Sequence, residues 1–254
     1  MSPLTIYFSD HHPTHPEPLR SEKFQTNFHR CDIFVLEVVD QWLLVEPDLE
    51  LKYNRLSQGE IESIRSSDDV ESMLPNRFRL ELDANIHRSR KKIVLERSPI
   101  PYLNAKAFGG ELRVALRKGV DWAMTTCRLQ QQQPATSVVQ RDRALVELIC
   151  EYLSDHVKVF AFRGAAHEPC LSRLLDTRRI VFKTERFKPP SLLERAVTPL
   201  TVGETLPDLD LLRLIYVSIN DQQEDYGKLM SLVEKVEAMT EEQLRTELEI
   251  FQQL

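Results

Sequence analysis

Three features that would each indicate a class of protein are missing from this sequence. No apolar run approaches the roughly 20 residues that a membrane-spanning helix needs, and the first residues do not resemble a signal segment. A net charge of -6 leaves no excess of basic residues for binding phosphate groups. The four cysteines show no CxxC spacing, which argues against a zinc ribbon and a disulfide framework. We therefore expect a cytoplasmic protein that binds neither nucleic acid nor membranes.

Apolar runs and helical periodicity alternate along the first 187 residues. Runs rich in Val, Ile and Phe predict strands at 4–8, 31–39, 92–96, 157–162 and 179–184. Apolar residues repeated every three or four positions, together with cap signals, predict helices at 18–30, 49–73, 78–88, 111–127, 137–153 and 168–175. The polar stretch 128–137, which contains a proline, is expected to be a surface loop. The alternation predicts an α/β domain with a mainly parallel central sheet, built from two β-α-β halves with flanking helices.

The last part of the chain has a different pattern. Residues 188–254 begin with clustered prolines and continue as Glu- and Leu-rich helices, one of which opens on Thr240 with acidic residues in its first turn. We therefore expect residues 1–187 to form the α/β domain and residues 188–254 to form a helical C-terminal appendage. Its leucine-lined faces are typical of core packing, and they would also serve a protein partner or self-association.

Ionisable side chains stand in or directly after the predicted strands. Glu37 lies inside an apolar strand, and Glu96 ends the next one. His12 and His167 follow the first and the fourth strand. A buried charge is costly unless it is paired or coordinated, and the carboxyl ends of parallel strands gather at one edge, where ligands bind. We expect these residues to form one site, either for a divalent metal (Zn, Mn or Co) or for general-base catalysis by a His–Glu pair.

Each of these signals also has an ordinary structural interpretation. A histidine after a strand is more often a hydrogen-bonded turn residue than a ligand, and the segment HHPTH at 11–15 would serve as a solvated loop. Glu96 precedes Arg97, so a salt bridge would account for it. Arg141 and Asp142 begin an amphipathic helix, where an acidic residue is common.

Four stretches follow one another in the order of a known motif set. They are TIYFSDHH, CDIFVLEVVD, QRDRALVELI and VKVFAFRGAAHEPCLSRLL, and they span residues 4–175. The set resembles that of the TraB/GumN/Tiki superfamily, a group related to erythromycin esterase-like and ChaN-like proteins. Its motifs are a strand ending in GxxH, a strand with an embedded Glu, a helix opening on Arg-Asp, and a strand ending in a second GaxH. Here Ser9 stands where the first motif has Gly, and either His11 or His12 is its histidine.

The resemblance implies a hydrolase and assigns roles to particular residues. Tiki-like members are metal-dependent peptidases, which implies a divalent metal held by His12, His167 and Glu37, and a peptide substrate. Glu37 or Glu96 would take a proton from the metal-bound water. Arg141 would stabilise the developing oxyanion, and Asp142 would hold a histidine or the start of the helix.

Two alternatives to the metal-dependent hydrolase stay open. In the esterase branch the same His and Glu act on water without a required metal, and the substrate would be a small ester or lactone. A non-catalytic binding or assembly protein would keep the scaffold and use its helical tail to engage a partner. Ser9 in place of glycine favours the assembly protein, whereas the retained His and Glu residues favour a hydrolase.

Overall fold

The computed structural model describes residues 3–9, 17–37, 85, 91–96, 109–153, 156–220 and 226–253, and its contacts divide the chain into two compact units. The first, here called the α/β unit, consists of Met1–Pro101 and Arg141–Pro189. The second, the helical unit, consists of Tyr102–Gln140 and Pro190–Leu254. The helical unit thus includes residues 102–140, which the sequence analysis assigned to the α/β domain.

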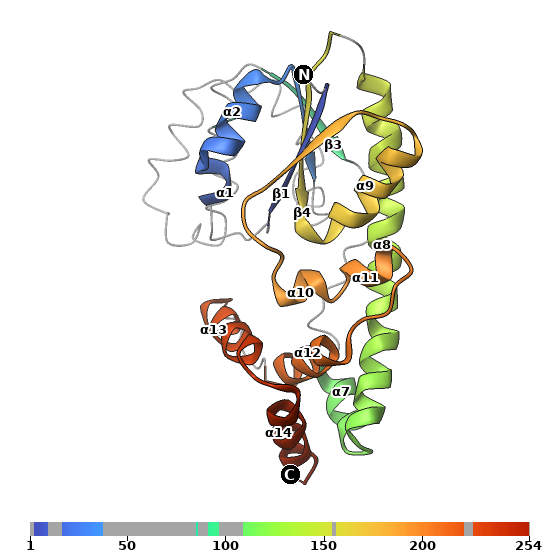
Figure 1. Cartoon of the computed structure of the whole chain (residues 1–254), viewed down its shortest axis with the longest axis vertical. Helices are drawn as coiled ribbons and strands as arrows, with labels where there is room; N and C mark the ends of the chain where they lie inside the picture. Colours follow the sequence, from blue (N-terminus) through green and yellow to red (C-terminus); the bar gives the residue numbers. More distant parts are fainter. Residues whose placement is uncertain are drawn as a thin grey trace. The chain divides into compact units, whose positions relative to one another are not determined.

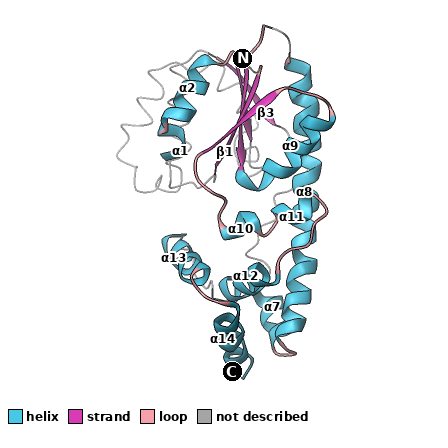
Figure 2. Ribbon diagram, viewed as in Figure 1, coloured by secondary structure: helices cyan, strands magenta, loops and turns pink. Residues whose placement is uncertain are grey.

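The centre of the α/β unit is a five-stranded parallel sheet (Figure 1, Figure 2). Its strands are β1 (Leu4–Ser9), β2 (Ile33–Glu37), β3 (Lys92–Glu96), β4 (Val159–Gly164) and β5 (Phe182–Arg186). Their order across the sheet is β3-β2-β4-β1-β5, and every pairing is parallel. The predicted fold class is therefore confirmed. The predicted helices at 49–73 and 78–88 lie outside the described residues, apart from the helical Asn85.

Strand β5 begins three residues later than the sequence pattern predicted. Helix α9 (Glu168–Thr177) ends in a turn where Arg179 adopts a φ of 57°, which is a left-handed conformation. The amide of Ile180 donates to the Leu175 carbonyl at 3.0 Å across this turn. Residues 179–181 therefore close the helix, and the strand starts only at Phe182.

Helices cover both faces of the sheet (Figure 1). Helices α1 (Glu17–Arg20) and α2 (Glu22–Arg30) lie on one face, over a core that is largely aromatic. This core consists of Tyr7, Leu19, Phe24, Phe28, Cys31, Phe34, Leu36, Ile93, Phe160 and Phe162. The opposite face packs aliphatic residues against α9 and the C-terminal part of helix α8 (Val120–Tyr152). Successive strand residues alternate between the two faces because side chains in a strand have a period of two.

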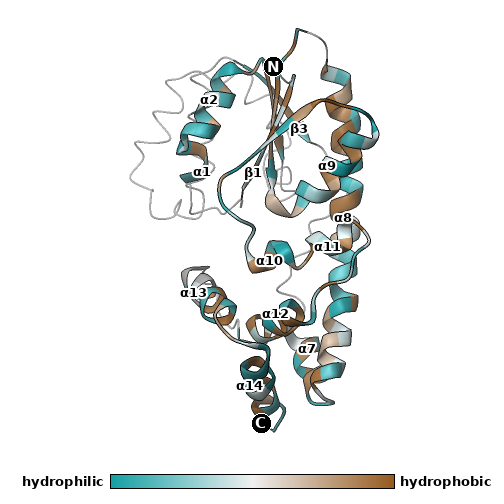
Figure 3. Cartoon of the chain, viewed as in Figure 1, coloured by the Kyte–Doolittle hydropathy of each residue, from teal (hydrophilic) through white to brown (hydrophobic). Residues whose placement is uncertain are grey.

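The expected loop at 128–137 is wrong, because this stretch is part of α8 and Pro134 lies inside the helix. A proline in a helix interior costs about 3 kcal/mol, so packing must offset it. Cys127, Gln131 and Ala135 are all buried at a spacing of four, which keeps one face of the helix in the core. The polar composition therefore reflects an exposed helical face. Figure 3 shows hydrophobic and hydrophilic residues mixed along α8.

The expected single helix at 111–127 is in fact two helices. Helix α7 (Gly109–Leu116) ends at a turn in which the Gly119 amide donates to the Leu116 carbonyl at 2.9 Å. Gly119 adopts a φ of 131°, which side chains other than glycine rarely tolerate. Helix α8 begins at the next residue, Val120. The glycine, rather than a loss of apolar periodicity, separates the helices.

The helical unit is formed by α7, the first part of α8, and five further helices. These are α10 (Leu192–Arg195), α11 (Thr198–Thr201), α12 (Asp208–Asn220), α13 (Tyr226–Glu237) and α14 (Glu241–Gln253). Helix α12 contacts α7, α13 and α14 and contributes most to their shared apolar core. Thr240 caps α14 as predicted, since its Oγ1 accepts from the Gln243 amide at 3.2 Å. Among the described residues, no helix is long and apolar enough to cross a membrane.

Candidate functional site

The carboxyl ends of the neighbouring strands β2 and β4 lie at the point where the connections between strands start to run toward opposite edges of the sheet. From β2 the chain continues to β3 on one side, and from β4 it continues to β5 on the other. Such a switch point is where ligands bind in open parallel sheets. Glu37 ends β2 in register with Glu96 of β3, and Gly164 ends β4. Alternation places both glutamates on the face covered by α8 and α9.

Arg163 of β4 lies at the centre of the buried side chains at this edge and is only 1% exposed. Its Nη1 pairs with Glu96 Oε2 and lies 3.5 Å from Glu37 Oε1. Its Nη2 lies 3.2 Å from Asp142 Oδ1. Arg163 was not among the predicted site residues, although a charge inside the apolar run FAFRG is the same signal that identified Glu37. Burial lowers the pKa of Arg163 and Glu37 opposes that effect, and a guanidinium stays protonated in either case.

Arg141 and Asp142 reach the site from α8, whose buried residues here face the sheet. Arg141 Nη2 lies 2.8 Å from Glu37 Oε1, and its Nε lies 3.5 Å from Glu96 Oε1. Nevertheless, among the described residues neither nitrogen donates a hydrogen bond of good geometry. The two ion pairs therefore balance the charge of Arg141, although neither Nε nor Nη2 points its hydrogen well at a carboxylate oxygen.

His167 closes the short 3₁₀ helix η4 (Ala165–His167), directly after β4. Its Nδ1 lies 2.7 Å from Asp142 Oδ1, and its Nε2 lies 3.3 Å from Glu37 Oε1. The other oxygen of Glu37, Oε2, accepts a hydrogen bond from the Gly164 amide at 2.9 Å. One imidazole is therefore held between two carboxylates, each of which comes from a different element of the fold.

Burial and charge act against each other in the pair formed by His167 and Asp142. Burial disfavours the imidazolium, but the Asp142 and Glu37 carboxylates outweigh it and raise the pKa of His167. For Asp142, burial disfavours the charged carboxylate and raises its pKa, although the nearby His167 opposes this rise. Burial, with Asp142 as a further cause, raises the pKa of the neighbouring Cys170 to about 12, so this cysteine stays a thiol. The charged forms of the histidine and the aspartate thus stabilise each other in a buried contact.

The site therefore brings together five of the six residues that the sequence analysis proposed. They are Glu37, Glu96, Arg141, Asp142 and His167, all of which are buried. His12, with its alternative His11, lies outside the described residues. The roles assigned to these residues stay predictions. We refer to the five residues together with Arg163 as the buried cluster.

The described donors do not fit a metal ion in their present arrangement. Glu37 Oε1 faces Arg141, Arg163 and His167, and its Oε2 accepts from a backbone amide. Both oxygens of Glu96 face the same two guanidinium groups. Within the described ranges, no group of three or more His, Cys, Asp or Glu side chains is arranged to hold a metal. A metal held partly by His12 stays a prediction of the resemblance.

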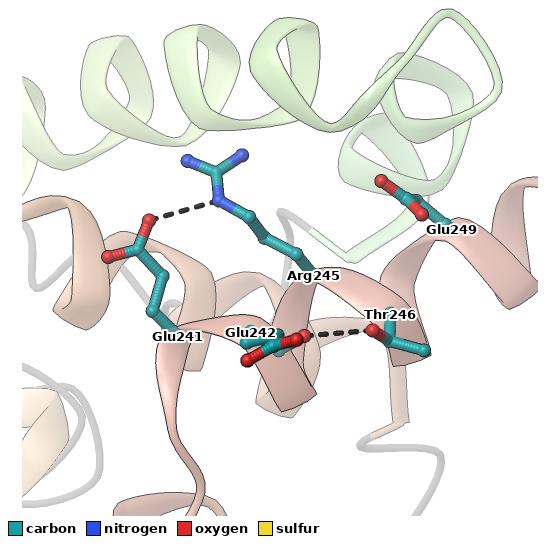
Figure 4. A pocket seen from close by; sticks show the side chains of 5 residues that line it. All are labelled: Glu241, Glu242, Arg245, Thr246 and Glu249. Carbon is teal, nitrogen blue, oxygen red and sulfur yellow. Dashed lines mark hydrogen bonds and ion pairs between the residues drawn. The ribbon is translucent and has the colours of Figure 1, made fainter.

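A separate hollow of about 450 Å³ lies on α14 in the helical unit (Figure 4). Its lining residues are Glu241, Glu242, Arg245, Thr246 and Glu249. Glu241 accepts from Arg245 Nε at 3.0 Å, and the Thr246 hydroxyl donates to the Glu242 carbonyl at 2.9 Å. Contacts between residues four apart are ordinary on a surface helix. The buried cluster is therefore the better candidate site.

Comparison with known proteins found no matching family model, no similar curated protein and no similar solved structure. The resemblance to the TraB/GumN/Tiki superfamily therefore depends on the motifs alone.

Proposed function

We propose that this chain is a metal-independent hydrolase that acts on a small ester or lactone, with Glu37, His167 and Arg141 as its catalytic residues. The observation that carries the proposal is the position of Arg141, which is buried beside Glu37 and whose Nε and Nη2 donate no hydrogen bond among the described residues. Donors held in a site with little water are well suited to stabilise an oxyanion. The switch point of a parallel sheet is also the usual position of a ligand site.

Ester hydrolysis needs a base, an oxyanion donor and an acid, and the cluster supplies one candidate for each. Glu37 takes a proton from water as the water oxygen attacks the ester carbonyl carbon. Arg141 donates to the carbonyl oxygen as it gains negative charge. When the tetrahedral intermediate collapses, the C–O bond to the leaving alcohol breaks and the alkoxide takes a proton from His167. The proton on Glu37 then returns to His167 across the 3.3 Å contact, which leaves an acid and an alcohol as products.

The remaining residues of the buried cluster position these three. Asp142 holds Nδ1 of His167 at 2.7 Å, so that Nε2 points toward Glu37. The pKa of His167 is raised, which favours the protonated form that an acid catalyst requires. Glu96 lies against both guanidinium groups and keeps Arg141 beside Glu37.

The test is hydrolysis of a panel of p-nitrophenyl esters and chromogenic lactones by the whole chain. Glu37→Gln removes the base and is expected to lower kcat about 100-fold or more, which is the usual scale of general-base catalysis. Glu147→Gln is the matched control, because this glutamate lies on α8 with a side chain that is 61% exposed. Circular dichroism of both variants checks that they are folded.

Arg141→Met tests the oxyanion donor, and Arg143→Met is its control because Arg143 is exposed on the same helix. Loss of a donor is expected to lower kcat about 100-fold while KM changes little. A chelator should leave the wild-type rate unchanged. A rate that disappears with chelator and returns with Mn²⁺, Co²⁺ or Zn²⁺ would overturn the metal-independent mechanism in favour of the metal-dependent peptidase that the resemblance implies.

The second candidate is a binding or assembly protein in which the buried cluster has a structural role only. The extensive mutual pairing of the cluster favours it, because each charge already has an opposite charge nearby. This candidate predicts no turnover on any ester, lactone or peptide, and partner binding that survives His167→Ala. Turnover that is lost in Glu37→Gln but not in Glu147→Gln excludes it.

A further inference from the structure

The guanidinium of Arg163 lies between three carboxylate oxygens and one imidazole nitrogen, all of which are atoms that can also ligate a metal ion. Glu96 Oε2 and Glu37 Oε1 lie on its Nη1 side, the latter at 3.5 Å. Asp142 Oδ1 at 3.2 Å and His167 Nδ1 at 3.5 Å lie on its Nη2 side. Carboxylate oxygens with an imidazole nitrogen are the donor set that Mn²⁺, Co²⁺ and Zn²⁺ take in proteins. The group held by these donors is nevertheless a side chain of the protein itself.

The strand register brings Arg163 to this place. Val159 and Ala161 of β4 lie in the core on the α8 and α9 face, so residue 163 points to the same face two positions later. The same alternation brings Glu37 and Glu96 to that face from β2 and β3. A long cationic side chain at position 163 therefore enters the space between the carboxylates.

We propose that Arg163 is a built-in cation that takes the place of a divalent metal in this site, and that its removal uncovers a metal site formed by Glu37, Glu96, Asp142 and His167. This inference does not depend on the proposed hydrolysis, since metal binding alone tests it. It explains why the described donors, although close together, do not fit a metal in the wild-type chain.

Charge balance supports the exchange of a guanidinium for a metal. With His167 protonated, as its raised pKa favours, the three carboxylates balance the two guanidinium groups and the imidazolium. Without Arg163, and with His167 neutral as a metal ligand must be, two negative charges remain, which a single divalent ion brings to zero. Buried carboxylates without a partner are strongly unfavourable, so the variant site should attract a cation and couple its binding to folding. Truncation to alanine also removes the guanidinium from the space between the donors.

The experiment measures binding of Co²⁺ to the whole chain by calorimetry and by the visible absorption of the bound ion. The wild type should bind no Co²⁺ at the buried cluster, and Arg163→Ala should bind one equivalent at least about 100-fold more tightly than the wild type. Adding Glu96→Gln to Arg163→Ala should weaken that binding about 10- to 100-fold, because it converts one ligand carboxylate to an amide. Arg143→Ala, which removes an exposed arginine from α8, should bind no more than the wild type.

Two results would overturn the proposal. One is tight Co²⁺ binding by the wild type that is lost in Glu37→Gln, because Arg163 would then not exclude a metal. The other is a folded Arg163→Ala variant that binds no Co²⁺. If the variant is unfolded, thermal melts are repeated with Co²⁺ present. Folding that appears only with the ion supports the proposal, and a chain that stays unfolded at saturating Co²⁺ contradicts it, because a divalent cation would then not replace the guanidinium.

Discussion

The α/β unit and the helical unit differ in whether they bury charged side chains. Among the described residues, every buried Asp, Glu, Arg and His belongs to the α/β unit. In the helical unit the core is apolar, and the ion pairs of its described residues are half-buried or exposed. Arg128 and Asp208, for example, pair at 3.0 Å with side chains that are 38% and 59% exposed. Both units have exposed ion pairs, such as Arg178 with Glu147 in the α/β unit, but among the described residues only the α/β unit also buries charged side chains.

The two kinds of burial contribute differently to the stability of a fold. Apolar burial stabilises a fold by about 25 cal/mol for each Å² removed from water, whereas a buried ion pair often contributes less than apolar residues of the same size would. The core of the helical unit consists of buried apolar residues. The α/β unit keeps six charged side chains buried at the carboxyl edge of its sheet, the kind of place where perturbed ionisable groups mark candidate functional sites.

The largest expected effect is the loss of one partner from the buried cluster. Glu96→Ala removes the carboxylate that faces both Arg141 and Arg163 in a buried site, and we expect the free energy of unfolding to fall by about 3–5 kcal/mol. Asp208→Ala in the exposed pair of the helical unit should cost less than about 1 kcal/mol. Urea unfolding of both variants measures the contrast, and equal losses would contradict the distinction between the units.

An intermediate effect is expected where two helices of the helical unit approach closely. A Cβ atom at Gly109 of α7 would lie 2.6 Å from the carbonyl oxygen of Ser218 in α12, so Gly109→Ala must move backbone. We expect a loss of about 1–3 kcal/mol, which is typical of overpacking.

Gly110 provides the matched control, because a Cβ atom there would meet nothing within 4 Å. Gly110→Ala in the same helix should be neutral or should stabilise by up to about 1 kcal/mol. Thermal melts of the two variants compare them directly. If both variants shift the Tm equally, the result contradicts the close packing of α7 against α12 at Gly109.

The smallest expected effect is the loss of a helix cap. Thr240→Ala removes the hydroxyl that accepts from the Gln243 amide at the start of α14, and about 1 kcal/mol of stability should be lost. Thr240→Ser keeps the acceptor and should behave like the wild type. A loss in Thr240→Ser as large as that in Thr240→Ala would show that the methyl group, and not the cap, stabilises this position.

Much of the candidate site was predictable from patterns along single strands. Glu37 and Glu96 interrupt or end apolar runs, and a period of two places them on the same face of the sheet. The same reasoning applied to FAFRG would have identified Arg163 as well. The closeness of Asp142 to His167 was not predictable from local pattern, because they are 25 residues apart on different elements.

The chain also shows where local pattern misleads. The stretch around Pro134 has the composition of a loop, yet it continues α8, since burial of one helical face outweighs the proline. Conversely, the unbroken apolar pattern across Gly119 hid a turn that depends on one backbone angle. Pro134 thus failed to end a helix, whereas Gly119 ended one that its neighbours in the sequence would continue.

The amino-acid sequence by itself determined the α/β class, the strand and helix types in most described segments, and the glutamates and histidine that mark the sheet edge. These follow from local physical rules, namely the two side-chain periods and the cost of burying charge. Only the tertiary structure decided the strand order, the division that assigns residues 102–140 to the helical unit, and the central position of Arg163 among the carboxylates. These depend on contacts between residues far apart in the chain, whose energies become decisive only when the packed elements exclude water.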